Sequence, residues 1–382
     1  MNAKKVIIGI CRILVGALFI FSGFIKANDP LGFSYKLDEY FGVFGVTRFF
    51  PDPTTVYLSM IICVFEIFVG ICLLVGVFRN FTAWMLLLMI IFFSFLTFYS
   101  AYFNKVTDCG CFGDALHLKP WQSFTKDMIL LVLILPIFFN RQYINPLFGK
   151  RSSRMVALLV MLASVLFTIF AYYYMPFIDF RPYAVGKDIQ SEMIIPPGAL
   201  KDSTVMTFVY KNNKTGEKVE FSMSDLSHLD SVKAAQYTFV TRKDKKIREG
   251  YKPPIHDFSI QGKDSDVTKS FLAEKGYRLM IVQYDIEKSN TRAQPELNKL
   301  VRHLIQDSKV KIWPLSGSSS AMNDNYIKKN HVPYTFYSAD VTMLKTIVRS
   351  NPGLVLFHDN VVVRQWPSTA LPSIEKIYAN MK

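Results

Sequence analysis

Five segments of the chain are long and apolar enough to cross a lipid bilayer as helices. A helix rises about 1.5 Å per residue, so about 20 apolar residues span the hydrocarbon layer. The fourth segment contains Asp127, which we expect near the outer interface, and Pro136, which we expect to kink the helix. The sequence therefore predicts a helical membrane bundle, with spans at roughly residues 5–26, 55–78, 81–103, 121–140 and 155–175.

Basic residues in the short connections predict how these helices are oriented. Lys4 and Lys5 precede the first segment and Arg79 separates the second from the third. Four more basic residues separate the fourth segment from the fifth: Arg141, Lys150, Arg151 and Arg154. If the helices alternate, all of these positions lie on one side, which the excess of Lys and Arg predicts to be the cytoplasm. The loop at 27–54, the loop around residue 110 and the chain after about residue 176 are then predicted to lie in the periplasm of a bacterial cell.

The net charge of the 382-residue chain is +14, which by itself is compatible with nucleic-acid binding. Many of the basic residues flank the apolar segments, and the others are scattered through the polar half without forming a stripe. This distribution is typical of residues that orient helices and contact anionic lipid headgroups. We therefore expect membrane lipid, and not nucleic acid, as a partner.

Cys109 and Cys111 form the one cysteine pair outside the predicted spans, in the polar sequence Asp-Cys-Gly-Cys-Phe-Gly-Asp. Thiols outside the inner membrane tend to form disulfides. A disulfide across one intervening residue closes a tight ring, and strained, exposed disulfides are the labile ones. We predict a redox pair. The alternatives are a structural disulfide and a metal site with His117, although zinc prefers four ligands with wider spacing. The other cysteines lie within spans, where we expect them to pack: Cys11, Cys63 and Cys72.

Ionisable residues near the membrane form a second group of candidates. Glu66 lies near the middle of the second segment, where a carboxylate costs at least about 2.5–3.5 kcal/mol, so we expect a role in proton relay or quinone contact. The alternative is a protonated Glu66 bonded to a neighbouring helix. Lys26 and Asp29 lie at the outer end of the first segment, where they can form a local ion pair or contact a headgroup. For Lys26 we favour snorkelling to the interface.

The polar half of the chain is predicted to begin with a small β-rich subdomain at 177–254. Val205–Tyr210 and Lys218–Phe221 alternate apolar and polar residues and flank a turn, as the strands of a hairpin do. Gln236–Arg242 and Lys246–Tyr251 are predicted to flank a second, basic turn.

Residues 255–382 are predicted to alternate between strands and helices in the order β-α-β-α-α-β-β-α, which gives a sheet covered by helices. Asp340 is a plausible N-cap for the third helix. The expected elements are Tyr277–Tyr284, Glu296–Ile305, Val310–Leu315, Ala321–Lys329, Asp340–Arg349, Gly353–Phe357, Val361–Trp366 and Pro372–Met381.

This order of elements, with Asn351 and Pro352 just before the third strand, resembles the thioredoxin fold. The resemblance implies a cis bond at Pro352 and a groove beside Asn351 and Pro352 that binds an extended peptide or a thiol protein. The Cys-x-x-Cys of that family is missing, because its place reads Asp285-Ile286-Glu287-Lys288-Ser289-Asn290. We therefore expect that this domain cannot carry out dithiol exchange by itself.

Two motifs within residues 1–140 resemble the DoxX and MauE family of redox-associated membrane proteins. Residues 22–26 read Ser-Gly-Phe-Ile-Lys and are followed by Asp29-Pro30 and Gly32-Phe33. Residues 109–113 read Cys-Gly-Cys-Phe-Gly, with Glu66 in the intervening span. The resemblance implies a role in periplasmic disulfide formation during enzyme maturation, or in quinone-coupled thiol oxidation.

The predicted organisation is a DoxX/MauE-like four-helix membrane domain at 1–145 and a basic cytoplasmic loop with a fifth span at 146–176. A β-rich periplasmic subdomain at 177–254 and a thioredoxin-like domain at 255–382 follow. We predict an inner-membrane thiol–disulfide oxidoreductase in which Cys109 and Cys111 exchange electrons with a periplasmic thiol client, with a quinone as the candidate electron acceptor. The alternative is a non-enzymatic scaffold that binds its partner through the thioredoxin-like groove. A small-solute transporter is disfavoured, because no repeat is visible.

Overall fold

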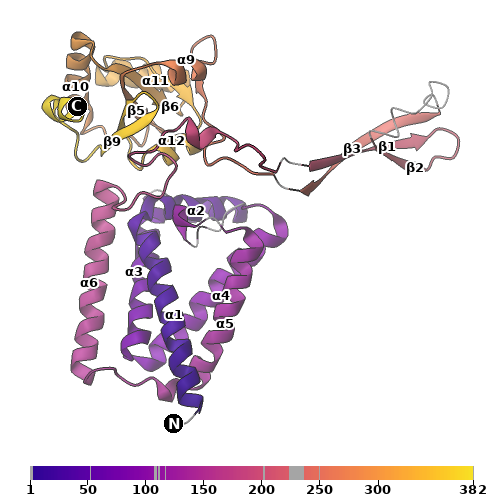
Figure 1. The fold of residues 1–382 in the computed structure, drawn as a ribbon, viewed down its shortest axis with the longest axis vertical. Helices are drawn as coiled ribbons and strands as arrows, with labels where there is room; N and C mark the ends of the chain where they lie inside the picture. Colours follow the sequence, from indigo (N-terminus) through magenta and orange to yellow (C-terminus); the bar gives the residue numbers. More distant parts are fainter. Residues whose placement is uncertain are drawn as a thin grey trace. The chain divides into compact units, whose positions relative to one another are not determined.

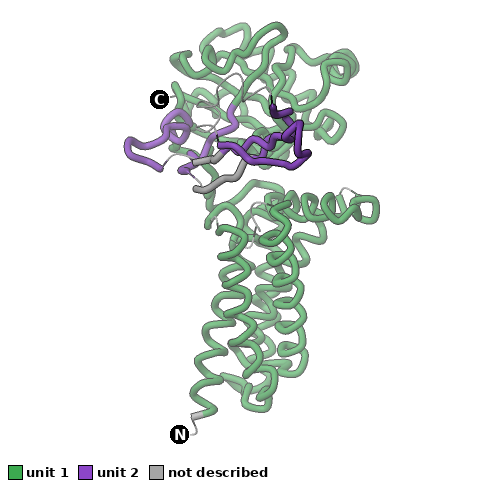
Figure 2. The backbone as a smooth tube through the Cα atoms, turned by 90° about the vertical axis from the view of Figure 1, so that its right-hand side faces the viewer, with its two compact units in different colours: residues 1–187, 259–382 green, residues 188–258 purple. Residues whose placement is uncertain are grey.

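The structure is a computed structural model that describes residues 3–51, 53–106, 110, 112–116, 118–200, 203–222, 236–248 and 250–381. Cys109, Cys111 and His117 lie outside the described residues, so the structure does not test the predicted redox pair of Cys109 and Cys111. The chain forms two compact units (Figure 2). One comprises Met1–Lys187 with Ser259–Lys382, and the other is Asp188–Phe258.

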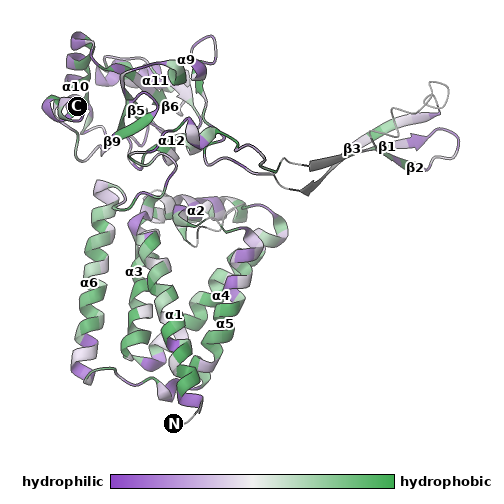
Figure 3. Cartoon of the chain, viewed as in Figure 1, coloured by the Kyte–Doolittle hydropathy of each residue, from purple (hydrophilic) through white to green (hydrophobic). Residues whose placement is uncertain are grey.

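Among the described residues, five helices are long and apolar enough to cross a membrane, which confirms the five predicted spans. Helix α1 packs mainly against α3, α4 against α5, and α3 also against α6 (Figure 1). Most of their residues are hydrophobic, as the colouring of Figure 3 shows. The core of the bundle contains Val15, Leu73 and Leu86, each fully buried. The helices are α1 (Ala3–Asn28), α3 (Thr54–Val75), α4 (Arg79–Phe103), α5 (Pro120–Phe139) and α6 (Lys150–Tyr174).

The segment interpreted from the sequence as a loop at 27–54 contains a helix, α2 (Pro30–Phe44), so that interpretation was wrong. Asp29 is its N-cap and accepts a hydrogen bond from the backbone N–H of Gly32, and Pro30 occupies the first turn. Leu37 and Tyr40 are buried. With 15 residues, the helix is too short to span a bilayer.

The C-terminal part of the larger unit is a sheet with the strand order β4-β7-β6-β5-β8-β9. Strand β5 pairs in parallel with β6 and antiparallel with β8. Six of the seven residues of β5 are buried. The strands are β4 (Ile260–Gln261), β5 (Tyr277–Gln283), β6 (Lys311–Ser316), β7 (Tyr337–Ala339), β8 (Gly353–His358) and β9 (Val361–Pro367). The helices are α9 (Thr268–Ala273), α10 (Gln294–Asp307), α11 (Ser320–Asn330), α12 (Val341–Ile347) and α13 (Ile374–Ala379).

The predicted order of these elements was incomplete at two places. Strand β7 lies between α11 and α12, where the sequence interpretation has two consecutive helices. It has only three residues, none of them buried, and so carries no readable alternation. The predicted N-cap is confirmed, because the Asp340 carboxylate accepts hydrogen bonds from the N–H groups of Thr342 and Met343. Strand β4 and helix α9, which precede β5, were not predicted.

The smaller unit contains an antiparallel sheet of order β2-β1-β3, formed by β1 (Ser203–Asn212), β2 (Lys218–Ser222) and β3 (Tyr237–Arg248). The predicted hairpin of β1 and β2 is confirmed. The second predicted hairpin was wrong, because its basic turn lies within the single long strand β3. Strand β3 pairs with β1 from Tyr237 to Arg248.

Helix α13 is held to α10 by a short hydrogen bond from the Tyr378 hydroxyl to the Asp307 carboxylate. This bond is the main reason why the pKa of Tyr378 rises to about 12, from about 10 in an unperturbed tyrosine. Because the folded-state pKa is raised, the stability that this bond contributes is fully present below about pH 10 and is lost as the pH rises through about 12.

We expect an ultraviolet difference titration of the wild type against Tyr378→Phe to show a phenol that ionises near pH 12. When Asp307→Ala is compared with the double variant Asp307→Ala and Tyr378→Phe, the midpoint of the difference should lie closer to pH 10, the usual pKa of tyrosine. An unchanged midpoint in Asp307→Ala would show that the hydrogen bond is not the cause.

Candidate functional site

Lys26, in the last turn of α1, and Glu66, on α3, form an ion pair inside the bundle. The Lys26 Nζ lies 2.6 Å from the Glu66 Oε2, and the two residues are only 2% and 3% exposed. The Lys26 ammonium also lies 4.6 Å from the ring centroid of Phe93. The predicted snorkelling of Lys26 was therefore wrong, because a carboxylate on the adjacent helix and an aromatic ring hold the ammonium inside the bundle. Glu66 does bond to a neighbouring helix, but its partner is a cation.

Asp127 on α5 belongs to a second buried polar group, which was not predicted to be functional. It is 1% exposed. Its Oδ2 accepts a hydrogen bond from the Thr97 hydroxyl of α4 at 2.9 Å, and its Oδ1 lies 2.8 Å from the Lys126 Nζ. The available sequence signal was that Asp127 is an acid within an apolar segment. From this signal only a position near the outer membrane interface was predicted.

A small cavity connects the two charged pairs. It has a volume of about 20 Å³ and is lined by Lys26, Glu66, Lys126 and Asp127, with Phe112 among the other lining residues. A second cavity, beside Lys26, has about 10 Å³. Volumes of this size hold about one water molecule, whereas ligand sites usually measure about 300–1,000 Å³. A quinone ring does not fit in either cavity, and we derive no step through one.

The described residues next to the two cysteines contact the bundle. Phe112 is 7% exposed and lies 5.7 Å from the ring of Phe21, centroid to centroid, and its ring lies 5.1 Å from the Lys126 Nζ. Gly110 has a φ of +64°, and a Cβ added there would lie 3.0 Å from the Cγ of Lys36. Glycine suits this position because the backbone is left-handed and comes close to a side chain.

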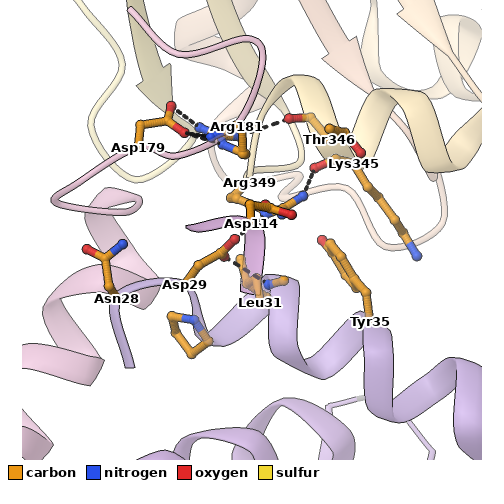
Figure 4. A network of polar contacts seen from close by, with 12 residues as sticks. Asn28, Asp29, Leu31, Tyr35, Asp114, Asp179, Arg181, Lys345, Thr346 and Arg349 are labelled. Atoms are coloured by element: carbon orange, nitrogen blue, oxygen red, sulfur yellow. Dashed lines mark hydrogen bonds and ion pairs between the residues drawn. The ribbon is translucent and has the colours of Figure 1, made fainter. Parts of the chain in front are cut away.

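Arg349, just after α12, connects the α/β part of the larger unit to the bundle (Figure 4). Its Nε lies 2.8 Å from the Asp29 Oδ2 and its Nη2 lies 2.7 Å from the Asp114 Oδ2. Burial opposes the charge of the guanidinium, but the two carboxylates outweigh it and hold the pKa of Arg349 above its ordinary value. Asp29 thus pairs with Arg349, and the ion pair with Lys26 that we had considered is not formed.

The peptide bond between Asn351 and Pro352 is cis. Both residues are buried. The Asn351 Nδ2 donates to the Asp285 carbonyl at 2.6 Å, and the Asn351 carbonyl accepts from the Asn290 N–H at 2.8 Å. Asn351 therefore holds the 285–290 loop, the segment that lacks cysteine. That Asn351 and Pro352 bind a partner remains a prediction.

A larger cleft lies beside this loop. It has a volume of about 480 Å³, and its lining includes Tyr35 of α2, Tyr284, Asp285 and Lys345. The Tyr35 and Tyr284 hydroxyls are 3.2 Å apart and hydrogen-bonded. Burial is the main cause that raises the pKa of both phenols, so both are neutral near pH 7. The cleft is large enough for a ligand or a short peptide segment.

The bundle, its buried charges and Asp114 all fall within the part of the chain that resembles a known family. Residues 4–140 match the family of methylamine utilisation protein MauE. The match covers α1 to α5, so the N-terminal part of this membrane protein is MauE-like, as its two motifs indicated. Together with the five apolar helices, it identifies a multi-pass membrane protein.

The MauE-like part contains Lys26, Asp29 and Glu66, whereas α6 and the α/β part, including Arg349, lie beyond the match. Residues 204–249, a range that includes β2, β3 and all but the first residue of β1, match a domain of unknown function (DUF8463). No curated protein matches the chain.

Three residues of the site were missed at the sequence level. Asp127 and Asp114 each carried a weak signal, the first as an acid within a span and the second as the last residue of the cysteine motif. Arg349 carried none, because the chain contains 44 Lys and Arg residues and this one lies in an ordinary polar context.

Proposed function

We propose that the protein is an inner-membrane thiol-redox component in which Cys109 and Cys111 exchange electrons with a thiol protein of the periplasm. The observation that carries the proposal is the pairing of Arg349 with Asp114. Asp114 follows Cys111 by three residues, and Arg349 precedes the cis Pro352 by three. The MauE match supports a role in redox chemistry or maturation of the methylamine-utilisation type.

The elementary step is thiol–disulfide exchange. A client thiolate attacks one sulfur of the Cys109–Cys111 disulfide, the S–S bond breaks, and a mixed disulfide forms while the other cysteine leaves as a thiolate. A second client thiolate then attacks the client sulfur of the mixed disulfide and releases the second cysteine. The client gains a disulfide, and the two electrons remain on Cys109 and Cys111 as two thiolates, which take up the protons that the client thiols release.

Glu66 is the group that we propose for proton exchange during this step. Its carboxylate lines the cavity of about 20 Å³ that also contacts Phe112, the residue that follows Cys111. A water molecule of that cavity would connect Glu66 to Asp127. Lys26 holds the Glu66 carboxylate in place through the bond of 2.6 Å.

The α/β part, which we propose to be thioredoxin-like, recruits the client and does not react with it. The 285–290 loop has no cysteine to exchange. The cleft of about 480 Å³ next to that loop is a suitable site for a client segment, because Tyr35, Tyr284 and Lys345 offer it hydroxyl and ammonium groups. Lipid headgroups contact the basic residues that flank the spans.

The proposal predicts that Cys109→Ser and Cys111→Ser lower client oxidation by about two orders of magnitude or more, because one sulfur cannot complete the exchange. One of the two variants should accumulate a mixed disulfide, which mass spectrometry would identify together with its client. Cys11→Ser is the matched control, since Cys11 is a buried free thiol in α1 and should leave oxidation unchanged. Oxidation at the wild-type rate in both variants would contradict the proposal.

The same pair tests the proposed orientation. An impermeant thiol reagent applied to intact spheroplasts should label reduced Cys109 and Cys111 if their loop is periplasmic. Labelling that requires lysis would place the loop in the cytoplasm and contradict the proposal.

A scaffold without redox activity is the second candidate. It is favoured by the 285–290 loop, which contains no cysteine. Titration of the purified protein in defined thiol redox buffers separates the two functions. A Cys109–Cys111 pair that stays oxidised, or stays reduced, across the physiological range supports the scaffold.

A further inference from the structure

We propose that Asp29, Gly32 and Asp114 form a guanidinium socket on the membrane bundle, which Arg349 fills, and that this interaction fixes the α/β part to the bundle. The socket is defined as these three residues. The proposal depends on the geometry around Arg349 and not on the redox function.

The shape of the socket matches the hydrogen-bonding groups of a guanidinium. The Arg349 Nε faces the Asp29 Oδ2 at 2.8 Å, and the Nη2 faces the Asp114 Oδ2 at 2.7 Å. The Nη1 donates to the backbone carbonyl of Lys345 in a short hydrogen bond. All three nitrogens are therefore used, in different directions, whereas a lysine offers a single ammonium centre.

Gly32 provides the space that the guanidinium needs. A Cβ added at this position would lie 2.3 Å from the Asp29 Oδ2 and 2.9 Å from the Arg349 Nη2. Glycine is a poor helix former, yet Gly32 lies in the first turn of α2. We attribute its presence there to the ion pair between Asp29 and Arg349, which any larger side chain would disturb.

Burial makes the interaction strong. Arg349 is 6% exposed, and its guanidinium carbon lies 5.6 Å from the ring centroid of Tyr35. The side chains of Asp29 and Asp114 are more exposed, at 16% and 29%, so without the guanidinium their two negative charges repel each other and separation of the α/β part would expose them to water. The two acids contribute two negative charges against one positive charge, so the emptied socket would attract another cation.

A second anchor reaches the same end of α12. Asn28 at the end of α1 binds the backbone of Ile178 through both amide atoms, at 2.7 Å and 3.0 Å. Arg181, three residues further along, donates to the carbonyls of Thr346 and Ile347, both at 3.2 Å. The connection that follows α6 is thus held to α1 and to α12, next to the socket (Figure 4).

The test is hydrogen exchange on the full-length protein in lipid nanodiscs. In Arg349→Ala we expect the backbone amides of residues 31–35 and 341–348 to exchange about a hundredfold faster, because separation of the α/β part from the bundle removes the contacts of these segments. The amides of β8 should remain protected, which would show that the sheet is still folded. Arg364→Ala is the matched control, since Arg364 is an exposed arginine of the same α/β part.

Two further arms separate the socket from a general loss of folding. Gly32→Ala leaves the α/β sequence intact and should produce the same faster exchange from the bundle side. Methylguanidinium at millimolar concentration should restore protection in Arg349→Ala, and Arg349→Lys should remain open, because an ammonium cannot bond to both acids in the same way. Wild-type protection of both segments in Arg349→Ala and in Gly32→Ala would overturn the proposal. These measurements need no client and no cysteine chemistry, so their outcome is independent of the proposed redox function.

Discussion

Lys26→Met is expected to destabilise the membrane bundle by about 3–5 kcal/mol, the usual cost of removing one partner of a buried ion pair. The change leaves the Glu66 carboxylate buried at 3% exposure and deprives it of the ammonium at 2.6 Å. Glu66→Leu should have a similar effect, because it leaves the ammonium of Lys26 without its carboxylate. The measurement is the free energy of unfolding in mixed detergent micelles, followed by the helical circular dichroism signal.

The double variant Lys26→Met with Glu66→Leu should recover most of this loss, since neither charge is then buried alone. The matched control is Lys36→Met on α2, whose partner Glu39 lies 3.1 Å away. Both side chains of that pair are partly exposed, so the loss there should be only about 0–1 kcal/mol. If Lys26→Met unfolds with the wild-type free energy, the pair contributes no stability to the bundle and the burial argument is wrong.

The two residues of this pair show where prediction from the sequence stops. A lysine at the end of an apolar span can extend to the interface or turn inward, and the local sequence is the same in both cases. The choice depends on which residue of another helix faces it. Lys26 and Glu66 are 40 residues apart, and Asp29 and Arg349 are 320 apart. Such pairs require the topology, which periodicity and composition do not supply.

Features that depend on local patterns were predicted well. The five spans and the hairpin of β1 and β2 each have a continuous signal of hydropathy or alternation. Helix α2 has an N-cap at Asp29 and a proline at position 30, which are local signals of a helix start, but its length is below that of a membrane span. The sequence interpretation divided β3 at its basic residues because a run of charged residues is typical of a turn, whereas β3 pairs with β1 along its length as one strand. Tertiary pairing overrode the local signal there.

Gly70→Leu is expected to have an effect comparable to that of Lys26→Met, because it would force α1 and α3 apart. A Cβ added at Gly70 would lie 2.8 Å from the Cγ1 of Ile20, 3.0 Å from the carbonyl oxygen of Gly16 and 3.1 Å from the Ile20 N. Two of these three atoms belong to the backbone of α1, so no side-chain rotation relieves the clash. Small residues at such contacts allow two membrane helices to approach closely.

The expected loss for Gly70→Leu is at least about 3 kcal/mol, at the upper end of the usual range for overpacking, because the clash is with backbone atoms. Gly70→Ala should lose about 1–3 kcal/mol in the same unfolding measurement. Gly9→Leu is the matched control, since a Cβ added at Gly9 on α1 meets nothing within 4 Å, and we expect a change within about 0.5 kcal/mol.

Because Lys26 and Glu66 also join α1 to α3, Gly70→Leu should weaken their pair as well. Gly70→Leu combined with Lys26→Met should therefore cost less than the sum of the two single changes. Equal stability of Gly70→Leu and Gly9→Leu would show that the close approach of α1 and α3 is not required for the bundle to fold.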